Sequence, residues 1–379
     1  MRFEFATAAR IVFGPGTVRE VPAAAAEMGR RPLVVTRRST DLSCLGIAGE
    51  TFPIHFPIDG EPTVELLRQG AERAREADCD MVIALGGGSA IDAGKAIAAL
   101  LANGGDPLDY LEVVGQGKPL SRPSAPFIAI PTTAGTGSEV TRNAVLASPA
   151  HRVKASLRSP HMLPRLAVVD PELTLDLPPA LTASTGLDAL TQLIEPYVSI
   201  RANAMTDLYC AEGLRLASSA LRRAWRDGHD LAARTDMALA SLLGGLALAN
   251  AGLGAVHGFA APLGGMFDAP HGALCAALLP HAMRVNIAAL RAAANRAALL
   301  RYAVVARTLT GNSDSTPEDG ADWVAALCRD LEIRPLGAYG VRAADVPALA
   351  DQAARASSMK ANPIVLTRGQ LEELLTRAL

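Results

Sequence analysis

The stretch MVIALGGGSAIDAGKAIA, residues 81–98, contains a hydrophobic run, a glycine-rich turn and a helical pattern in direct succession. Beyond its first residue, Asp80–Leu85 is wholly apolar, which is typical of a strand buried inside a parallel sheet. Gly86–Ser89 then forms a turn, and Ala90–Ile97 has helical spacing. A glycine-rich turn that opens a helix lets backbone N–H groups approach a phosphate closely. The stretch therefore predicts a βα unit whose turn is either a phosphate site or an ordinary tight connection.

Hydrophobic runs and amphipathic helical patterns alternate over the first half of the chain, which is typical of a parallel sheet with crossover helices. Further predicted strands are Arg10–Phe13, Pro32–Thr36, Pro126–Ile130 and Leu166–Val169, with helices at Gly16–Met28 and Thr63–Ala77. Beyond Leu177-Pro178-Pro179 nearly every segment has helical periodicity. We therefore predict an α/β domain over residues 1–180 and an all-α domain over residues 181–379.

Composition excludes several classes of protein. The chain has 36 basic and 38 acidic residues and only 4% aromatic residues, so it lacks the basic, ring-rich surface of a nucleic-acid-binding protein. Its five cysteines form no C-x-x-C pair, which argues against a disulfide framework or a zinc knuckle. The N-terminal residues do not resemble a secretion signal, so we expect a cytoplasmic protein.

The segment Met237–Phe267 contains no Asp, Glu, Lys or Arg and is long enough to span a membrane. It also contains Asn250, His257 and Pro262 and many glycines, whereas a lipid-facing helix is more uniformly large and apolar. We therefore predict helices buried in protein and no membrane partner.

A second loop rich in glycine and hydroxyl groups, Pro131–Thr141, follows the predicted strand Pro126–Ile130. Ligands of open α/β sheets bind at the carboxyl ends of the strands. Two such loops in one half of the chain together favour a nucleotide site.

The helical half contains three credible ligands for a divalent transition metal. Asp188 and Gln192 are four residues apart and share one helix face. His257 and His271 enclose a charge-poor, glycine-rich segment, and one carboxylate with two imidazoles suits iron or zinc. Each histidine taken singly is more typical of a packing or capping residue than of a ligand, and the spacing alone does not decide between these roles.

Five blocks of the sequence, in order and spacing, resemble the iron-containing (group III) alcohol dehydrogenase family: GGGSAIDAGKAIA, PTTAGTGSEVT, SPHMLPRLAVVDPELT, TGLDALTQLIEPY and HGFAAPLGGMFDAPHG. The resemblance implies a Rossmann-like dinucleotide-binding domain followed by a helical metal domain, the architecture of dehydroquinate synthase. It also implies hydride transfer between NAD(P) and a small alcohol, aldehyde or ketone in the cleft between the domains. Members commonly dimerise through an N-terminal strand, for which Phe3–Phe5 is the candidate, so we expect a homodimer.

The resemblance also assigns site residues. The positions implied to hold the pyrophosphate are Gly86, Gly87, Gly88 and Ser89, with Asp92 in the following helix. Those implied to line the adenosine and nicotinamide ribose portions are Thr132, Thr133, Asn143 and Lys154. The metal-ligand positions are Asp188, Gln192, His257 and His271, and the two histidines are also the expected catalytic residues.

Three positions depart from the family pattern. Gln192 replaces a histidine ligand, and an amide oxygen binds Fe²⁺ or Zn²⁺ weakly, so we expect a lower metal affinity or loss of the metal. Ala261 replaces a histidine of the proton relay, so another group must transfer the proton. Arg37, followed by Arg38, replaces the aspartate that binds the ribose of NAD, which favours the 2′-phosphate of NADP.

These departures leave two mechanisms open. In the first, a metal polarises the carbonyl oxygen as a Lewis acid. In the second, protonated His257 or His271, or a cation such as Arg142 or Lys154, takes that role with an anionic carbonyl substrate, as in the maleylacetate reductase branch. Two less favoured alternatives are a sugar-phosphate cyclase, which needs more basic residues than follow His257, and a degenerate binding protein, which does not need intact cofactor loops.

Overall fold

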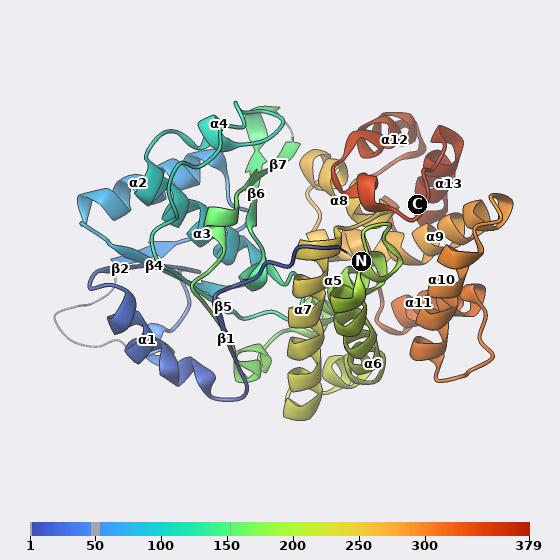
Figure 1. Cartoon of the computed structure of the whole chain (residues 1–379), viewed down its shortest axis with the longest axis horizontal. Helices are drawn as coiled ribbons and strands as arrows, with labels where there is room; N and C mark the ends of the chain where they lie inside the picture. The colour runs from blue at the N-terminus through green and yellow to red at the C-terminus, as the bar shows by residue number, and fades with distance from the viewer. Residues whose placement is uncertain (1, 47–53, 152) are drawn as a thin grey trace. The chain divides into compact units, whose positions relative to one another are not determined.

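The computed structural model describes residues 2–46, 54–151 and 153–379 (Figure 1). The chain divides into two compact units. The first, which we call the sheet unit, comprises Ala6–Thr133 and Gly137–Thr174. The second, the helical unit, comprises Leu175–Leu379 with Ala134–Thr136 and the N-terminal residues up to Phe5. The predicted fold class, a parallel α/β fold with an all-helical part after it, is confirmed.

The sheet unit is built on six parallel strands among the described residues, in the order β1-β8-β5-β4-β2-β3. Their bounds are β1 Arg10–Phe13, β2 Pro32–Thr36, β3 Ile54–Pro57, β4 Met81–Gly86, β5 Phe127–Pro131 and β8 Leu166–Val169. Every residue of β2, β4, β5 and β8 is buried, because helices cover both faces.

Helices on the two faces bury alternate residues of each strand. On one face α1 (Val21–Met28) shares a core with Val34 of β2, and on the other α2 (Val64–Glu76) and α3 (Gly88–Asn103) share a core with Leu33. This is the side-chain period of two that a strand imposes. A short helix, α4 (Pro107–Tyr110), follows α3.

Strand β4 lies at the position where the strand order reverses, between β5 and β2. Its register pairs Leu85 with Thr36 of β2 and Gly86 with Pro131 of β5. The segments that leave these three strands therefore start side by side, at the edge where such sheets bind ligands.

Three features of the sheet unit differ from the sequence prediction. Strand β3 and an antiparallel hairpin, β6 (Asn143–Ser148) with β7 (Val153–Arg158), were not predicted. The predicted helix Gly16–Met28 begins with a 3₁₀ turn at Thr17–Glu20, because Gly16 adopts a left-handed conformation with φ of 77° before the turn.

Nine α-helices form the described helical unit, with 3₁₀ turns only in the connections on either side of α12: α5 (Pro179–Val198), α6 (Ala204–Arg226), α7 (Leu231–Ala251), α8 (Ala255–Met266), α9 (His271–Ala292), α10 (Arg296–Thr310), α11 (Pro317–Asp330), α12 (Val346–Arg355) and α13 (Arg368–Ala378). Helix α5 packs against α6, α7 and α9. Glycine permits the close approach of α5 and α6: a Cβ on Gly213 would lie 2.3 Å from Leu193 Cδ2.

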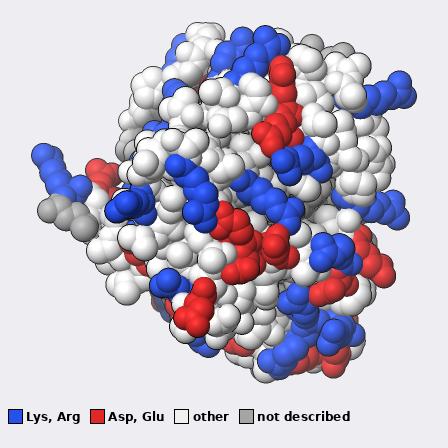
Figure 2. Space-filling view, turned by 90° about the vertical axis from the view of Figure 1, so that its right-hand side faces the viewer, with Lys and Arg blue, Asp and Glu red and all other residues white. Residues whose placement is uncertain are grey.

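Helices α7 and α9 are long and apolar enough to cross a membrane by length and composition alone. Within the protein, 61% and 83% of their most apolar windows are buried, as expected for core helices. On the face shown in Figure 2, basic side chains lie among acidic ones. Ion pairs such as Arg291–Glu318 neutralise charge locally. Phe3–Phe5 pairs with no strand of the described part of the chain, and the centroid of the Phe5 ring lies 5.6 Å from that of the Tyr209 ring.

Candidate functional site

Four potential metal ligands meet inside the helical unit. Asp188 comes from α5, His257 from α8, and His271 and Cys275 from the first turns of α9. One ligand atom of each side chain lies within 4.8 Å of one ligand atom of every other. The side chains of Asp188 and His257 are only 2% and 8% exposed, whereas His271 is 35% exposed, so the cluster is open to solvent on the His271 side.

The spacing of these atoms fits a tetrahedral ion. Asp188 Oδ1 lies 3.4 Å from His257 Nε2 and 3.8 Å from His271 Nε2. Cys275 Sγ lies 3.9 Å from His257 Nε2 and 3.6 Å from His271 Nε2. Ordinary zinc bond lengths give ligand-to-ligand distances of about 3.4 Å for oxygen with nitrogen and about 3.6 Å for nitrogen with sulfur. Asp188 Oδ1 is also buried and has no hydrogen-bond partner among the residues that the structure describes, so the residues present fit a divalent metal.

Glu195 orients His257. Its Oε2 lies 2.7 Å from His257 Nδ1, and its Oε1 accepts a 2.7 Å hydrogen bond from the Val256 N–H at the start of α8. A carboxylate is an acceptor, so Nδ1 carries the proton and the lone pair of Nε2 is directed to the cluster. A Cβ on Gly254 would lie 2.9 Å from Glu195 Oε1, which explains the glycine before this helix.

The electrostatics of the cluster favour positive charge. Burial alone would lower the pKa of His271, but the Cys275 sulfur and the Asp188 carboxylate raise it to about 9. Burial opposes ionisation of Asp188, yet the two histidines hold the pKa of this carboxyl below its usual value. A divalent cation provides the same stabilisation as protonated histidines.

The two departures in this region lie one helical turn from predicted ligands. Gln192 follows Asp188 on α5, is 3% exposed, and its Oε1 makes no hydrogen bond. Ala261 follows His257 on α8 and is partly buried. Its methyl group has no acidic or basic atom through which a proton could be relayed.

The predicted phosphate-binding turn lies at the reversal point of the sheet. Gly87 is the N-cap of α3, a helix of 16 residues, and no side chain caps it. The Thr132 N–H donates a 2.9 Å hydrogen bond to the Gly86 carbonyl, and a Cβ on Gly87 would lie 3.4 Å from Thr133 Cγ2. The two predicted cofactor loops are therefore adjacent, and the free N-terminus of α3 suits an anion.

Asp92 faces into the sheet unit. One of its oxygens accepts a hydrogen bond from the Ser138 hydroxyl and the other accepts a 2.8 Å bond from the Val145 N–H. Lys95 is fully buried and donates to the carbonyls of Ser138 and Asn143 at 2.8 and 2.7 Å. These residues position the second cofactor loop and β6.

The remaining predicted cofactor residues lie around the carboxyl edge and the hairpin. Arg37 follows β2 directly and is exposed. Asn143 begins β6 and Lys154 lies on β7, where its Nζ is 3.1 Å from Glu61 Oε1. The register of β2 with β4 thus places Arg37 at the same sheet edge as the glycine-rich turn, and Lys154 has an acidic partner.

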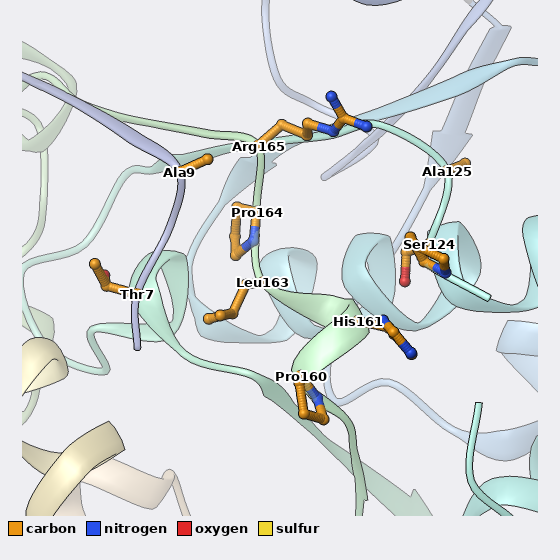
Figure 3. Close-up of a pocket in the computed structure, with 10 residues that line it drawn as sticks. Thr7, Ala9, Ser124, Ala125, Pro160, His161, Leu163, Pro164 and Arg165 are labelled. Atoms are coloured by element: carbon orange, nitrogen blue, oxygen red, sulfur yellow. The ribbon is translucent and has the colours of Figure 1, made fainter. Parts of the chain in front are cut away.

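A hollow of about 280 Å³ opens at the opposite edge of the sheet. Figure 3 shows Ala9, Ala125 and Arg165 around it, and these residues precede β1, β5 and β8. Its position at the amino ends of the strands separates it from the predicted cofactor loops.

Sequence reasoning missed Glu195, Lys95 and Cys275. Two of them had a spacing signal: Glu195 is seven residues after Asp188 on the same helix face, and Cys275 is four residues after His271. Lys95 looked like one polar residue of a predicted helix.

Comparisons with known proteins extend over both units. Residues 8–171 match the family described as iron-containing alcohol dehydrogenase, and residues 182–379 match the family described as Fe-containing alcohol dehydrogenase, C-terminal. The chain is 39% identical over 330 residues to alcohol dehydrogenase 4 of Schizosaccharomyces pombe, which covers 87% of this chain and 76% of that protein.

Several solved structures are similar over the full length. The 1,3-propanediol oxidoreductase structure is 33% identical with a TM-score of 0.91 and covers 100% of both chains. Sulfoacetaldehyde reductase from Bifidobacterium kashiwanohense in complex with NAD⁺ is 29% identical with a TM-score of 0.88, covering 100% of this chain and 99% of that one.

Proposed function

Because the chain belongs to the iron-containing alcohol dehydrogenase family, we propose that it transfers hydride between NAD(P) and a small alcohol, aldehyde or ketone in a metal-assisted reaction. The observation that supports metal assistance is the buried cluster around Asp188, whose Oδ1 lacks a hydrogen-bond partner and whose spacing suits a tetrahedral ion. A divalent metal held there would supply Lewis-acid polarisation of a carbonyl oxygen.

The chain's own residues prepare this site. Glu195 fixes the tautomer of His257, and the surrounding helices exclude water from Asp188. His271 lies at the accessible side of the cluster, so a small substrate would approach there. In the sheet unit, the proposed binding site for the pyrophosphate of the cofactor is the N-terminus of α3 together with the adjacent loop that contains Thr132 and Thr133.

We further propose a preference for NADP. Arg37 is the first residue after β2, and its side chain is exposed. The last residue of β2, Thr36, pairs with Leu85 of β4, which directly precedes the glycine-rich turn. A guanidinium at this position suits a 2′-phosphate, whereas an acidic side chain would favour the ribose hydroxyls of NAD.

A metal-independent reductase of an anionic carbonyl compound is the second candidate. The similarity to a sulfoacetaldehyde reductase, whose named substrate is anionic, favours this substrate class. Against it, Lys154 is already paired with Glu61, so this cation is partly neutralised.

The decisive experiment combines metal analysis with turnover on protein purified without a metal-affinity tag. We expect one zinc or iron per chain, oxidation of NADPH with short aldehydes, and loss of turnover on chelation that added metal restores. Full turnover after complete removal of the metal would instead support the metal-independent candidate. Absence of NAD(P)H oxidation with neutral and anionic aldehydes alike would contradict the proposed function.

A further inference from the structure

The cluster contains a ligand that the family resemblance does not provide. The resemblance implies a histidine at Gln192 on α5, whereas the fourth cysteine, histidine or acidic side chain that meets Asp188, His257 and His271 among the described residues is Cys275 on α9. We propose that the Cys275 thiolate is the fourth protein ligand of the metal centre and that it gives the centre a preference for zinc. This inference rests on the metal site of the proposed function, but it can be tested without turnover.

The position of Cys275 follows from helix geometry. His271 and Cys275 are four residues apart at the start of α9, so their side chains lie on one face. That face meets α5 and α8, which contribute Asp188 and His257. Cys275 is fully buried, and its sulfur lies 3.6 and 3.9 Å from the two Nε2 atoms. Both distances are close to the value of about 3.6 Å expected across a tetrahedral zinc.

Another buried cysteine shows the contrast. Cys328 donates its S–H to the Ala276 carbonyl at 3.5 Å, as a neutral thiol in a helical core does. The contacts of the Cys275 sulfur among the described residues are instead with metal-ligand types. The surroundings of the Cys275 sulfur are therefore those of a metal ligand.

Cys275 also changes the charge and softness of the centre. One carboxylate, one thiolate and two neutral imidazoles neutralise a divalent ion, whereas a set with one carboxylate and three imidazoles leaves one positive charge. Thiolate is a soft ligand that suits zinc, and the general order of affinities places zinc above Fe²⁺. We expect the centre to select zinc over iron when both are offered.

The test is metal titration of the full chain after chelation and dialysis. With Co²⁺ as a probe, the wild type should show a sulfur-to-cobalt charge-transfer band in the near ultraviolet. Cys275→Ser should lose this band and bind zinc more than about 100-fold more weakly, a larger loss than removal of an outer hydrogen-bond partner causes. Cys328→Ser, the matched control, should keep both the band and the affinity.

A rescue variant separates ligand loss from misfolding. Adding Gln192→His to Cys275→Ser should restore zinc affinity without restoring the charge-transfer band, because the new ligand is nitrogen. A wild type that binds Co²⁺ without this band, a Cys275→Ser variant with unchanged zinc affinity, or a wild type that binds no metal would each overturn the inference. NADPH oxidation is measured separately, so turnover in a Cys275→Ser protein with normal zinc affinity would leave the proposed function intact.

Discussion

Arg37 is a single residue at which a change of charge should alter the choice of cofactor. Because a charged hydrogen bond contributes about 1.5–3 kcal/mol, Arg37→Asp should lower kcat/KM for NADPH by about 10- to 100-fold. The value for NADH should fall far less or rise. Steady-state kinetics with both cofactors measure this directly.

The matched control for Arg37 lies at the other end of the same strand. Arg31 precedes β2 and is also exposed, so Arg31→Asp makes the same change in charge at the amino edge of the sheet. It should leave the NADPH to NADH ratio unchanged. Equal effects of the two substitutions would indicate a general loss of positive charge and would contradict a specific role for Arg37.

Glu195 of α5 connects two helices, because its carboxylate bonds to His257 and to the Val256 N–H of α8. In Glu195→Gln an amide nitrogen can face His257 Nδ1 and favour the tautomer whose Nε2 carries the proton. Zinc affinity should then fall by about 10- to 100-fold, as for other residues that orient a ligand. A chelator-competition titration gives the value.

A surface carboxylate of the same unit provides the control for Glu195. Glu373 pairs with Arg377 on α13 and its side chain is 48% exposed, so Glu373→Gln removes a carboxylate charge at the surface that forms no ion pair with any of the four ligands. Its zinc affinity should equal that of the wild type. An unchanged affinity in Glu195→Gln would show that something else orients His257.

The elements that are predicted correctly from the sequence each have a strong hydrophobic pattern of their own. Strand β4 and helix α3 follow from an unbroken apolar run, three glycines and helical spacing, all within residues 81–98. The β6–β7 hairpin has only a weak alternation, since small residues such as Ala144 and Ala155 fill its buried positions beside α3. Small side chains give little hydrophobic contrast, and the pattern was missed.

The metal cluster shows a similar limit at the level of elements. Asp188, His257 and His271 could be proposed from residue type and family resemblance. In the sequence Cys275 is one of five scattered cysteines, and its significance depends on α9 starting at His271. Only the packing of α5, α8 and α9 shows that this sulfur faces the other three side chains.

Buried charge also affects the stability of the whole molecule. Lys95 links α3 to the second cofactor loop and to β6 by hydrogen bonds, and its burial lowers the pKa of the ammonium to about 8. Glu139 lies in the same loop and is 2% exposed. Burial raises the pKa of this carboxyl to about 7, against an ordinary value of 4.5, although Lys95 partly opposes the shift.

The pH dependence of unfolding should therefore contain a contribution from Glu139. The folded protein holds this proton more tightly than the unfolded chain, so the stabilisation is complete below pH 4.5 and is lost as pH rises through 7. Lys95 remains protonated in both states over this range. From pH 4.5 to pH 7 the wild type should thus lose on the order of 1–3 kcal/mol more stability than Glu139→Gln, whose amide does not titrate.

Urea unfolding of metal-free protein at several pH values provides the measurement, with the wild type and Glu139→Gln compared at each pH. Other titrating groups, including the histidines, contribute equally to both proteins and cancel in the difference. The midpoint of Glu139→Gln should fall less steeply with pH than that of the wild type. Parallel pH profiles would mean that the Glu139 carboxyl titrates normally in the folded protein and that the loop around it is open to water.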